Sequence, residues 1–287
     1  MKIAIIGSAF SGNKGAAAML ESSIQHLSER GGGASFTLLS MYPSRDTALN
    51  PYDNVTVLRA TPARLGVVLN GAALAYRLLP PLRRAIEKAI PEVAALAAAD
   101  VMLDEGGITF VDGREKFLIY NVASVLPALL VGTPVVKVAQ AMGPFRNPLN
   151  RRAAKAILPR MAAVISRGAI THDHLVGLGL TNIHAGADLA FTLKVGPADV
   201  AAADQKIDST FFAAGDVIGF SPSAVLHKQA GAEGEEYLAE VVRAVDHLTG
   251  DLGRKVFLVA HSARAGTDKT HNNDLPVCRE IYSCLLY

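Results

Sequence analysis

The sequence predicts an α/β doubly wound fold, and two features of its 287 residues indicate this. Short apolar runs alternate along the chain with longer helical patterns, which is the order expected of strand–helix–strand units. Several runs, such as 3–6, are continuously apolar rather than alternating, as in parallel strands that are buried on both faces. Half of the residues are hydrophobic and 19% are charged, so the chain can bury a sizeable core.

A first Rossmann-like domain is expected over residues 1–195. Its predicted strands are 2–7, 35–41, 54–58, 101–104, 134–139, 163–166 and 182–185. Its predicted helices are 15–30, 82–98, 114–131, 148–161 and 171–178. This alternation places every predicted strand end, and the loop that follows it, at one edge of a parallel sheet.

A second domain is expected over residues 196–287. Its predicted elements are a strand at 217–220, a helix at 234–252, a strand at 255–260 and a helix at 274–286. Two strands are too few to close a sheet of their own. We therefore expect this domain to be incomplete, either because the chain is a truncated form of a longer enzyme or because a partner supplies the rest.

Composition excludes several classes of function. The net charge of +2 and the absence of Trp give no indication of a nucleic-acid partner. Cys278 and Cys284 fit no zinc or redox spacing and are expected to be reduced thiols. The most apolar segment, 65–82, is broken by Asn70, Arg77 and two prolines, short of the ~20 apolar residues of a membrane span. A cytoplasmic, soluble protein is expected.

The loop GSAFSGNKG at 7–15 follows the first strand and precedes a helix. Backbone N–H groups and the positive end of the helix dipole favour an anion there. The loop matches neither standard nucleotide motif, because Ala9 stands where GxGxxG needs glycine and Asn13 stands where a P-loop needs lysine. It is interpreted either as a ligand loop or as a tight structural turn.

Four more polar stretches lie at predicted strand ends: DEGGITFVDG, AQAMGPF, SRGAITHDHLVGLGL and GADLAFTL. Together with the opening loop they resemble the motifs of the polysaccharide pyruvyltransferase family, in the same order. The matching residues are Gly12–Gly15, Gly106–Gly107 with Asp112, Gln140–Pro144, Arg167 with Thr171, and Asp188–Phe191. The resemblance covers roughly residues 1–275.

The resemblance implies two Rossmann-like domains of glycosyltransferase-B type, the second of them incomplete. It also implies transfer of pyruvate from phosphoenolpyruvate to a sugar hydroxyl pair of a polysaccharide or its lipid-linked precursor, forming a ketal. No cofactor or metal is implied. The expected donor-binding residues are Asn13, Lys14, Gly15, Gly106, Gly107, Gln140, Gly143, Arg167 and Thr171. The candidates for the catalytic acid and base are His261, Glu105 and Asp112, and less strongly His172.

Most of these residues also have an ordinary structural interpretation. Thr171 fits a helix N-cap, and Asp188 fits a residue that holds its own turn. Glu105 and Asp112 fit simple loop residues.

The chain also departs from the family pattern. Ala16 replaces the loop acid, Glu105 replaces the first glycine of a GGG element, and no late Ser-x-Arg-x-His segment occurs.

Other functions therefore stay open. One is a nucleotide-sugar glycosyltransferase of the same architecture, and another is a non-catalytic ligand-binding remnant. The segment 59–88, with six basic residues among apolar ones, suggests peripheral contact with the inner face of a membrane, although a helix packed on the sheet explains it too. A homo-oligomer is also compatible with the sequence.

Overall fold

The computed structural model describes residues 1–213, 215–231, 234–263 and 273–285. It divides into two compact units. The first comprises Met1–Ser11 and Gly15–Lys194, and the second comprises Gly12–Lys14 and Val195–Tyr287. The predicted division into domains 1–195 and 196–287, the incompleteness of the second domain and the glycosyltransferase-B arrangement stay predictions.

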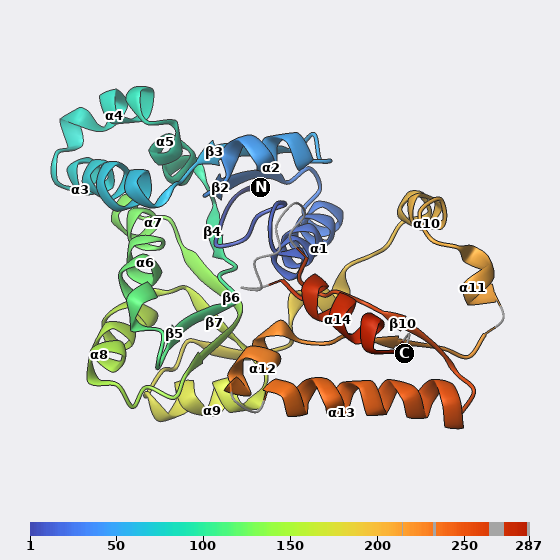
Figure 1. Ribbon diagram of the computed structural model, residues 1–287. Coiled ribbons are helices and arrows are strands. Elements are labelled where there is room, and N and C mark those ends of the chain that lie inside the picture. The colour runs from blue at the N-terminus through green and yellow to red at the C-terminus, as the bar shows by residue number, and fades with distance from the viewer. Residues whose placement is uncertain (214, 232–233, 264–272, 286–287) are drawn as a thin grey trace. The chain divides into compact units, whose positions relative to one another are not determined.

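A parallel sheet forms the centre of the first unit (Figure 1). Its strands lie in the order β3 (Val55–Arg59), β2 (Ser35–Ser40), β1 (Lys2–Ile6), β4 (Val101–Asp104), β6 (Val135–Gly143), β7 (Ala163–Arg167) and β8 (Ile183–Gly186). A further strand, β5 (Ile108–Val111), pairs with the end of β6. The strand order reverses between β1 and β4, and such a switch point is where doubly wound sheets bind ligands. The predicted α/β class with a mostly parallel sheet is confirmed.

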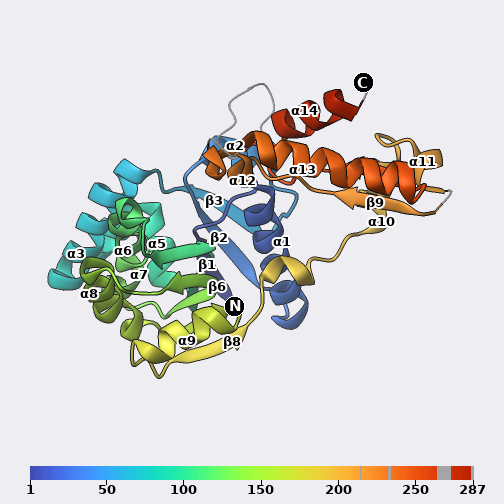
Figure 2. The same ribbon diagram turned by 60° about the horizontal axis from the view of Figure 1, so that its bottom comes forward.

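Helices cover both faces of this sheet, as Figure 2 shows. They are α1 (Lys14–Arg30), α2 (Pro43–Leu49), α3 (Asn70–Leu78), α4 (Arg83–Ala89), α5 (Pro91–Ala98), α6 (Leu118–Ala123), α7 (Leu126–Val131), α8 (Pro148–Ile157) and α9 (Ala169–Gly177). Short helical turns are η1 (Arg64–Leu69), η2 (Pro80–Leu82), η3 (Glu115–Phe117), η4 (Leu158–Arg160) and η5 (Leu189–Thr192). Successive residues of β1 point into two different hydrophobic cores. Ala4 and Ile6 belong to one core, and Ile3 and Ile5 belong to the other. Burial on both faces explains the continuous apolar run.

Several predicted elements differ in the structure, and three of the differences bear on the site and its surroundings. The helix predicted at 82–98 is two helices, because Ile90 is not helical ahead of Pro91. The helix predicted at 114–131 is divided into η3, α6 and α7. The strand predicted to end at 139 continues to Gly143, past a bulge at Ala139 with a φ of 48°, and β5 was not predicted.

The second unit holds a two-stranded parallel sheet of β9 (Val217–Phe220) and β10 (Lys255–Leu258). Its helical elements are α10 (Pro197–Asp204), α11 (Ser209–Ala213), α12 (Ala224–Gln229), α13 (Gly234–Asp246), η7 (His247–Asp251) and α14 (Leu275–Leu285). Val241, Val245, Val277 and Ile281 form the centre of its small core. The strand predicted at 217–220 is confirmed. Within the described part of the chain, no helix has the length and apolar composition needed to cross a bilayer.

Candidate functional site

The loops after β1 and β4 approach each other closely at the switch point of the sheet. A Cβ atom on Gly7 would lie 2.7 Å from the backbone nitrogen of Gly106, and Gly7 has a φ of 91°. Only glycine fits both the space and this backbone conformation. The Gly106 N–H donates a 3.0 Å hydrogen bond to Oδ1 of Asp104, which closes the second loop. The two glycine-containing loops therefore form one continuous backbone surface.

A buried polar network lies beneath the second loop. Lys137 Nζ lies 2.5 Å from Oδ2 of Asp104 and 3.2 Å from Oε1 of Gln140. Gln140 Nε2 donates to the backbone oxygen of Asp104 at 2.5 Å, and Thr109 Oγ1 donates to Gln140 Oε1 at 2.5 Å. All four side chains are buried, so each polar group depends on the others for its partner. This network fixes the conformation of the Gly106–Gly107 loop.

Gln140 was predicted to contact the donor. Its side-chain amide bonds to protein at both its oxygen and its nitrogen, which suits a residue that positions the loop, and contact of Gln140 with the donor stays a prediction. The sequence analysis did not identify Lys137 or Asp104. A lysine within the apolar run of a buried strand was the available signal, since buried lysines require a partner.

Glu105 is fully buried directly after β4. Ser8 Oγ donates a 2.7 Å hydrogen bond to its Oε2. Burial raises the pKa of Glu105 to about 7, helped by the charge of Asp104, while the Ser23 and Ser8 hydroxyls act to lower it. Among the described residues, Oε1 has no hydrogen-bond partner. A carboxyl with a pKa near neutrality can both give and accept a proton at physiological pH.

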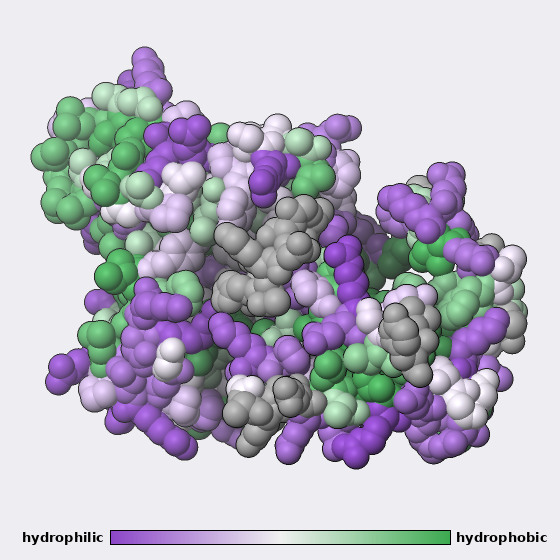
Figure 3. Space-filling model, in the orientation of Figure 1, coloured by the Kyte–Doolittle hydropathy of each residue, from purple (hydrophilic) through white to green (hydrophobic). Residues whose placement is uncertain are grey.

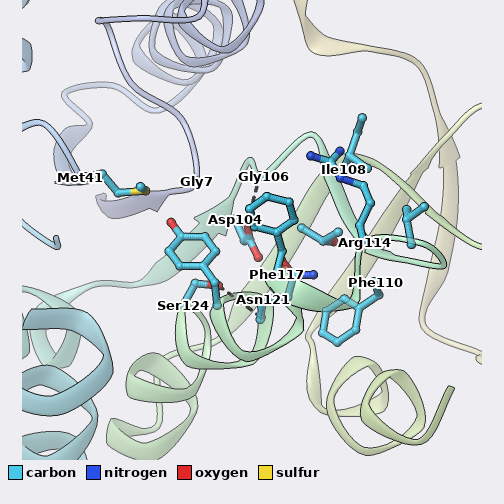
Figure 4. A pocket seen from close by; sticks show the side chains of 13 residues that line it. Gly7, Met41, Asp104, Gly106, Ile108, Phe110, Arg114, Phe117, Asn121 and Ser124 are labelled. Atoms are coloured by element: carbon cyan, nitrogen blue, oxygen red, sulfur yellow. Dashed lines mark hydrogen bonds between the residues drawn. The ribbon is translucent and has the colours of Figure 1, made fainter. Parts of the chain in front are cut away.

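A cavity of about 170 Å³ opens beside these loops (Figure 4). Gly7, Asp104 and Gly106 line it on one side, together with residues of β5 and of the segment 114–124. Asn121 lines it and is only 6% exposed, and its side-chain amide makes no hydrogen bond to the described residues. Burial raises the pKa of Tyr120, which also lines it, to about 12, so its hydroxyl keeps its proton. The cavity therefore presents polar groups that are available to a ligand.

Arg114 also lines the cavity, where its guanidinium lies over the ring of Phe117, 5.1 Å from the ring centre. The sequence analysis identified neither Arg114 nor Asn121. Arg114 directly follows the predicted motif 104–113, so extending that motif by one residue was the available signal for it, whereas Asn121 lies in α6 and had no such signal.

Asp112 holds the loop after β5 against the start of α8. Its Oδ2 accepts hydrogen bonds from the N–H groups of Arg146 and Asn147, and its Oδ1 accepts one from Asn150. Desolvation raises the pKa of Asp112, but these hydrogen bonds outweigh it and hold the pKa below its usual value. These three hydrogen bonds from the segment 146–150 suit the structural interpretation of Asp112, and its role as a catalytic acid or base stays a prediction.

Arg167 ends β7 and pairs with Asp188, Nη1 to Oδ2, at 2.8 Å. Asp188 also accepts the N–H of Ala190 and so caps η5. The structure thus joins two of the predicted motifs, at the same edge of the sheet as the Gly106–Gly107 loop, although Arg167 does not line the cavity. The predicted N-cap role of Thr171 is wrong, because Gly168 is the N-cap of α9 and Thr171 is buried one turn into the helix.

The remaining predicted residues are placed as follows. Gly107 has a φ of 62°, and its oxygen accepts the N–H of Ala141. Gly143 ends β6, and a Cβ there would lie 2.5 Å from Nδ1 of His174. Asn13 and Lys14 group with the second compact unit, as does the exposed His261 beyond β10. Donor binding by Asn13, Lys14 and Gly15 and catalysis by His261 stay predictions.

Comparisons with known proteins add independent findings. A family model described as polysaccharide pyruvyl transferase matches residues 13–285. A search of curated proteins returned no match. One solved structure that matches is that of Anabaena Alr3699/HepE in complex with UDP and glucose. It is 13% identical, the match covers 90% of this chain and 69% of that one, and the TM-score is 0.42. A score at this level does not establish a shared fold.

Proposed function

Because the chain belongs to the polysaccharide pyruvyl transferase family, we propose that it transfers pyruvate from phosphoenolpyruvate to a sugar. In this reaction the methylene carbon of the donor gains a proton, two sugar hydroxyl oxygens bond to the neighbouring carbon, and inorganic phosphate leaves. The two hydroxyl protons are released, one to a base and one to the phosphate or solvent. The product is a cyclic ketal on a polysaccharide or on its lipid-linked precursor.

The observation that carries this proposal is the Glu105 carboxyl at the switch point of the sheet. Its pKa of about 7 leaves it partly protonated at neutral pH, as a general acid for the methylene carbon requires. The residues on either side of it, Asp104 and Gly106, line the cavity. In the proposed reaction Glu105 supplies the proton, with Ser8 as its hydrogen-bonded neighbour.

The cationic side chains and hydrogen-bonding groups of the site suit phosphoenolpyruvate, which is an anionic substrate. Phosphoenolpyruvate carries a phosphate and a carboxylate, which cationic side chains and backbone N–H groups bind. Arg114 lines the cavity, and Arg167 lies at the same edge of the sheet. The uncharged Asn121 amide and Tyr120 hydroxyl in the cavity suit the hydroxyl groups of a sugar.

Calorimetry and a phosphate-release assay test this function. We expect the chain to bind phosphoenolpyruvate but not UDP- or GDP-sugars, and to release phosphate only when a glycan pool is added. In Glu105→Gln the side chain keeps its volume and an oxygen that can accept the hydrogen bond of Ser8, but it can no longer gain or lose a proton. It should retain donor binding and lose most of the phosphate release.

Two outcomes would contradict the proposal. Binding of a nucleotide sugar without binding of phosphoenolpyruvate would indicate a glycosyltransferase. Binding of phosphoenolpyruvate without phosphate release from any glycan would indicate a ligand-binding protein that is not an enzyme.

A further inference from the structure

The helical segment 64–89 is apolar on two opposite sides. Leu65, Leu69 and Ala73, spaced four residues apart, are buried against the first unit. On the other side, Val67 is 75% exposed and Leu78 is 65% exposed, with Leu74 between them. A surface helix normally has one apolar face toward the core and a polar face toward water, so a second apolar face requires another explanation.

The exposed apolar side chains form one surface, here named the α3–α4 face. Its members are Val67, Val68, Leu74, Leu78, Leu79 and Leu82. Figure 3 shows hydrophobic residues gathered over α3 and α4, at the upper left of the molecule. Scattered exposed leucines are ordinary, but contiguous apolar patches mark surfaces that bind other molecules.

Basic residues lie in the same segment of the chain as this face. The segment 64–89 contains five of them, Arg64, Arg77, Arg83, Arg84 and Lys88, and one acid, Glu87. Glu87 accepts the hydroxyl of Tyr76, and Arg64 pairs with the buried Glu92. Arg77, Arg84 and Lys88 are exposed and form no ion pair with the described residues. Five basic residues less Glu87 and the Glu92 that pairs with Arg64 leave a net charge of +3 in this part of the chain.

We propose that the α3–α4 face docks on an anionic lipid surface. The exposed leucines and Val67 would enter the interface between headgroups and acyl chains, and the basic side chains would contact lipid phosphates. A second copy of the chain is a poorer partner, because two faces of charge +3 repel each other. This proposal goes beyond the proposed reaction and does not depend on it.

Co-sedimentation with vesicles tests this proposal. The full chain should bind vesicles of phosphatidylcholine with phosphatidylglycerol, bind pure phosphatidylcholine weakly, and be released by salt. The double substitution Leu74→Ser/Leu78→Ser should weaken binding at least about tenfold, since it removes two apolar side chains that would enter the interface. Ile170→Ser is the matched control, because Ile170 is 76% exposed on α9, away from this face.

A second variant, Arg84→Gln/Lys88→Gln, alters only exposed side chains and is expected to fold. It should weaken binding to anionic vesicles and reduce the salt dependence of that binding, because Arg77 and Arg83 remain. The absence of binding to any vesicle would overturn the proposal, as would equal weakening by Ile170→Ser. Sedimentation showing a dimer that Leu74→Ser/Leu78→Ser dissociates would assign the face to a second copy instead. Because no sugar or donor is present, these results are independent of the enzyme assay.

Discussion

The Oγ of Ser8 donates a 2.7 Å hydrogen bond to Oε2 of Glu105, and this bond joins the loop after β1 to the loop after β4. The two loops meet where the strand order of the sheet reverses. A single hydrogen bond thus connects the first predicted motif with the second. It also keeps a carboxyl in a fully buried position, where the charged form is disfavoured.

Glu105→Gln should therefore change how stability depends on pH. The pKa of Glu105 is raised from 4.5 to about 7 in the folded chain, so folding favours the protonated form. Its contribution to stability is fully present below pH 4.5 and is lost as pH rises through about 7. The loss amounts to about 3 kcal/mol, from 1.36 kcal/mol for each pKa unit. Denaturant unfolding of both proteins between about pH 4 and pH 8 measures it.

The glutamine variant serves as its own control in this experiment. It has no proton to lose, so the difference in unfolding free energy between the two proteins should change by that amount across the range. Parallel pH curves for the two proteins would show that the carboxyl has an ordinary pKa.

Lys137→Met should destabilise the chain strongly. Lys137 and Asp104 are an almost completely buried ion pair, 2.5 Å apart, and removal of the lysine leaves Asp104 charged without its partner. Breaking such a pair costs about 3–5 kcal/mol. The double variant Lys137→Met/Asp104→Asn removes both charges and should recover part of the loss. Urea unfolding of the unaltered chain, the two single variants and the double variant measures the coupling energy between the two residues. If the losses of the two single variants add up to the loss of the double variant, the ion pair contributes nothing to stability.

The sequence predicted the strands well and the site only in part. Continuous apolar runs such as 3–6 identified the strands, because burial on both faces of a sheet leaves a clear local pattern. The strand β5 was interpreted as loop because glycines flank ITFV on both sides. Its pairing with the bulged end of β6 is a tertiary contact that no local pattern shows.

Side-chain partners were the main information missing from the sequence. Arg167, Asp188 and Gln140 were identified from their order along the chain, but not the bonds that each forms. Lys137 was missed because its partner Asp104 is 33 residues away. The raised pKa of Glu105 was likewise invisible, since it follows from burial rather than from neighbouring residues in the sequence.

Gly7→Ala should disturb the contact between the two loops. The added Cβ would lie 2.7 Å from the Gly106 nitrogen, and backbone atoms cannot rotate away as a side chain can. We expect a loss of about 2–4 kcal/mol in unfolding free energy, the sum of overpacking and left-handed strain. Gly132→Ala is the matched control, since Gly132 has a similar φ of 95° and open space around it. Equal losses in thermal or urea unfolding would show that strain alone acts at Gly7.

Arg167→Ala should abolish binding of phosphoenolpyruvate with little effect on stability. Arg167 and Asp188 are 29% and 27% exposed, and ion pairs with such access to water contribute about 0–1 kcal/mol. The guanidinium, in contrast, would supply a forked set of donors to a phosphate or carboxylate. Lys194→Ala is the control, because Lys194 forms an exposed ion pair with Glu29. Calorimetry should show donor affinity reduced at least about tenfold in Arg167→Ala alone, whereas unchanged affinity would assign Arg167 to holding the Asp188 turn.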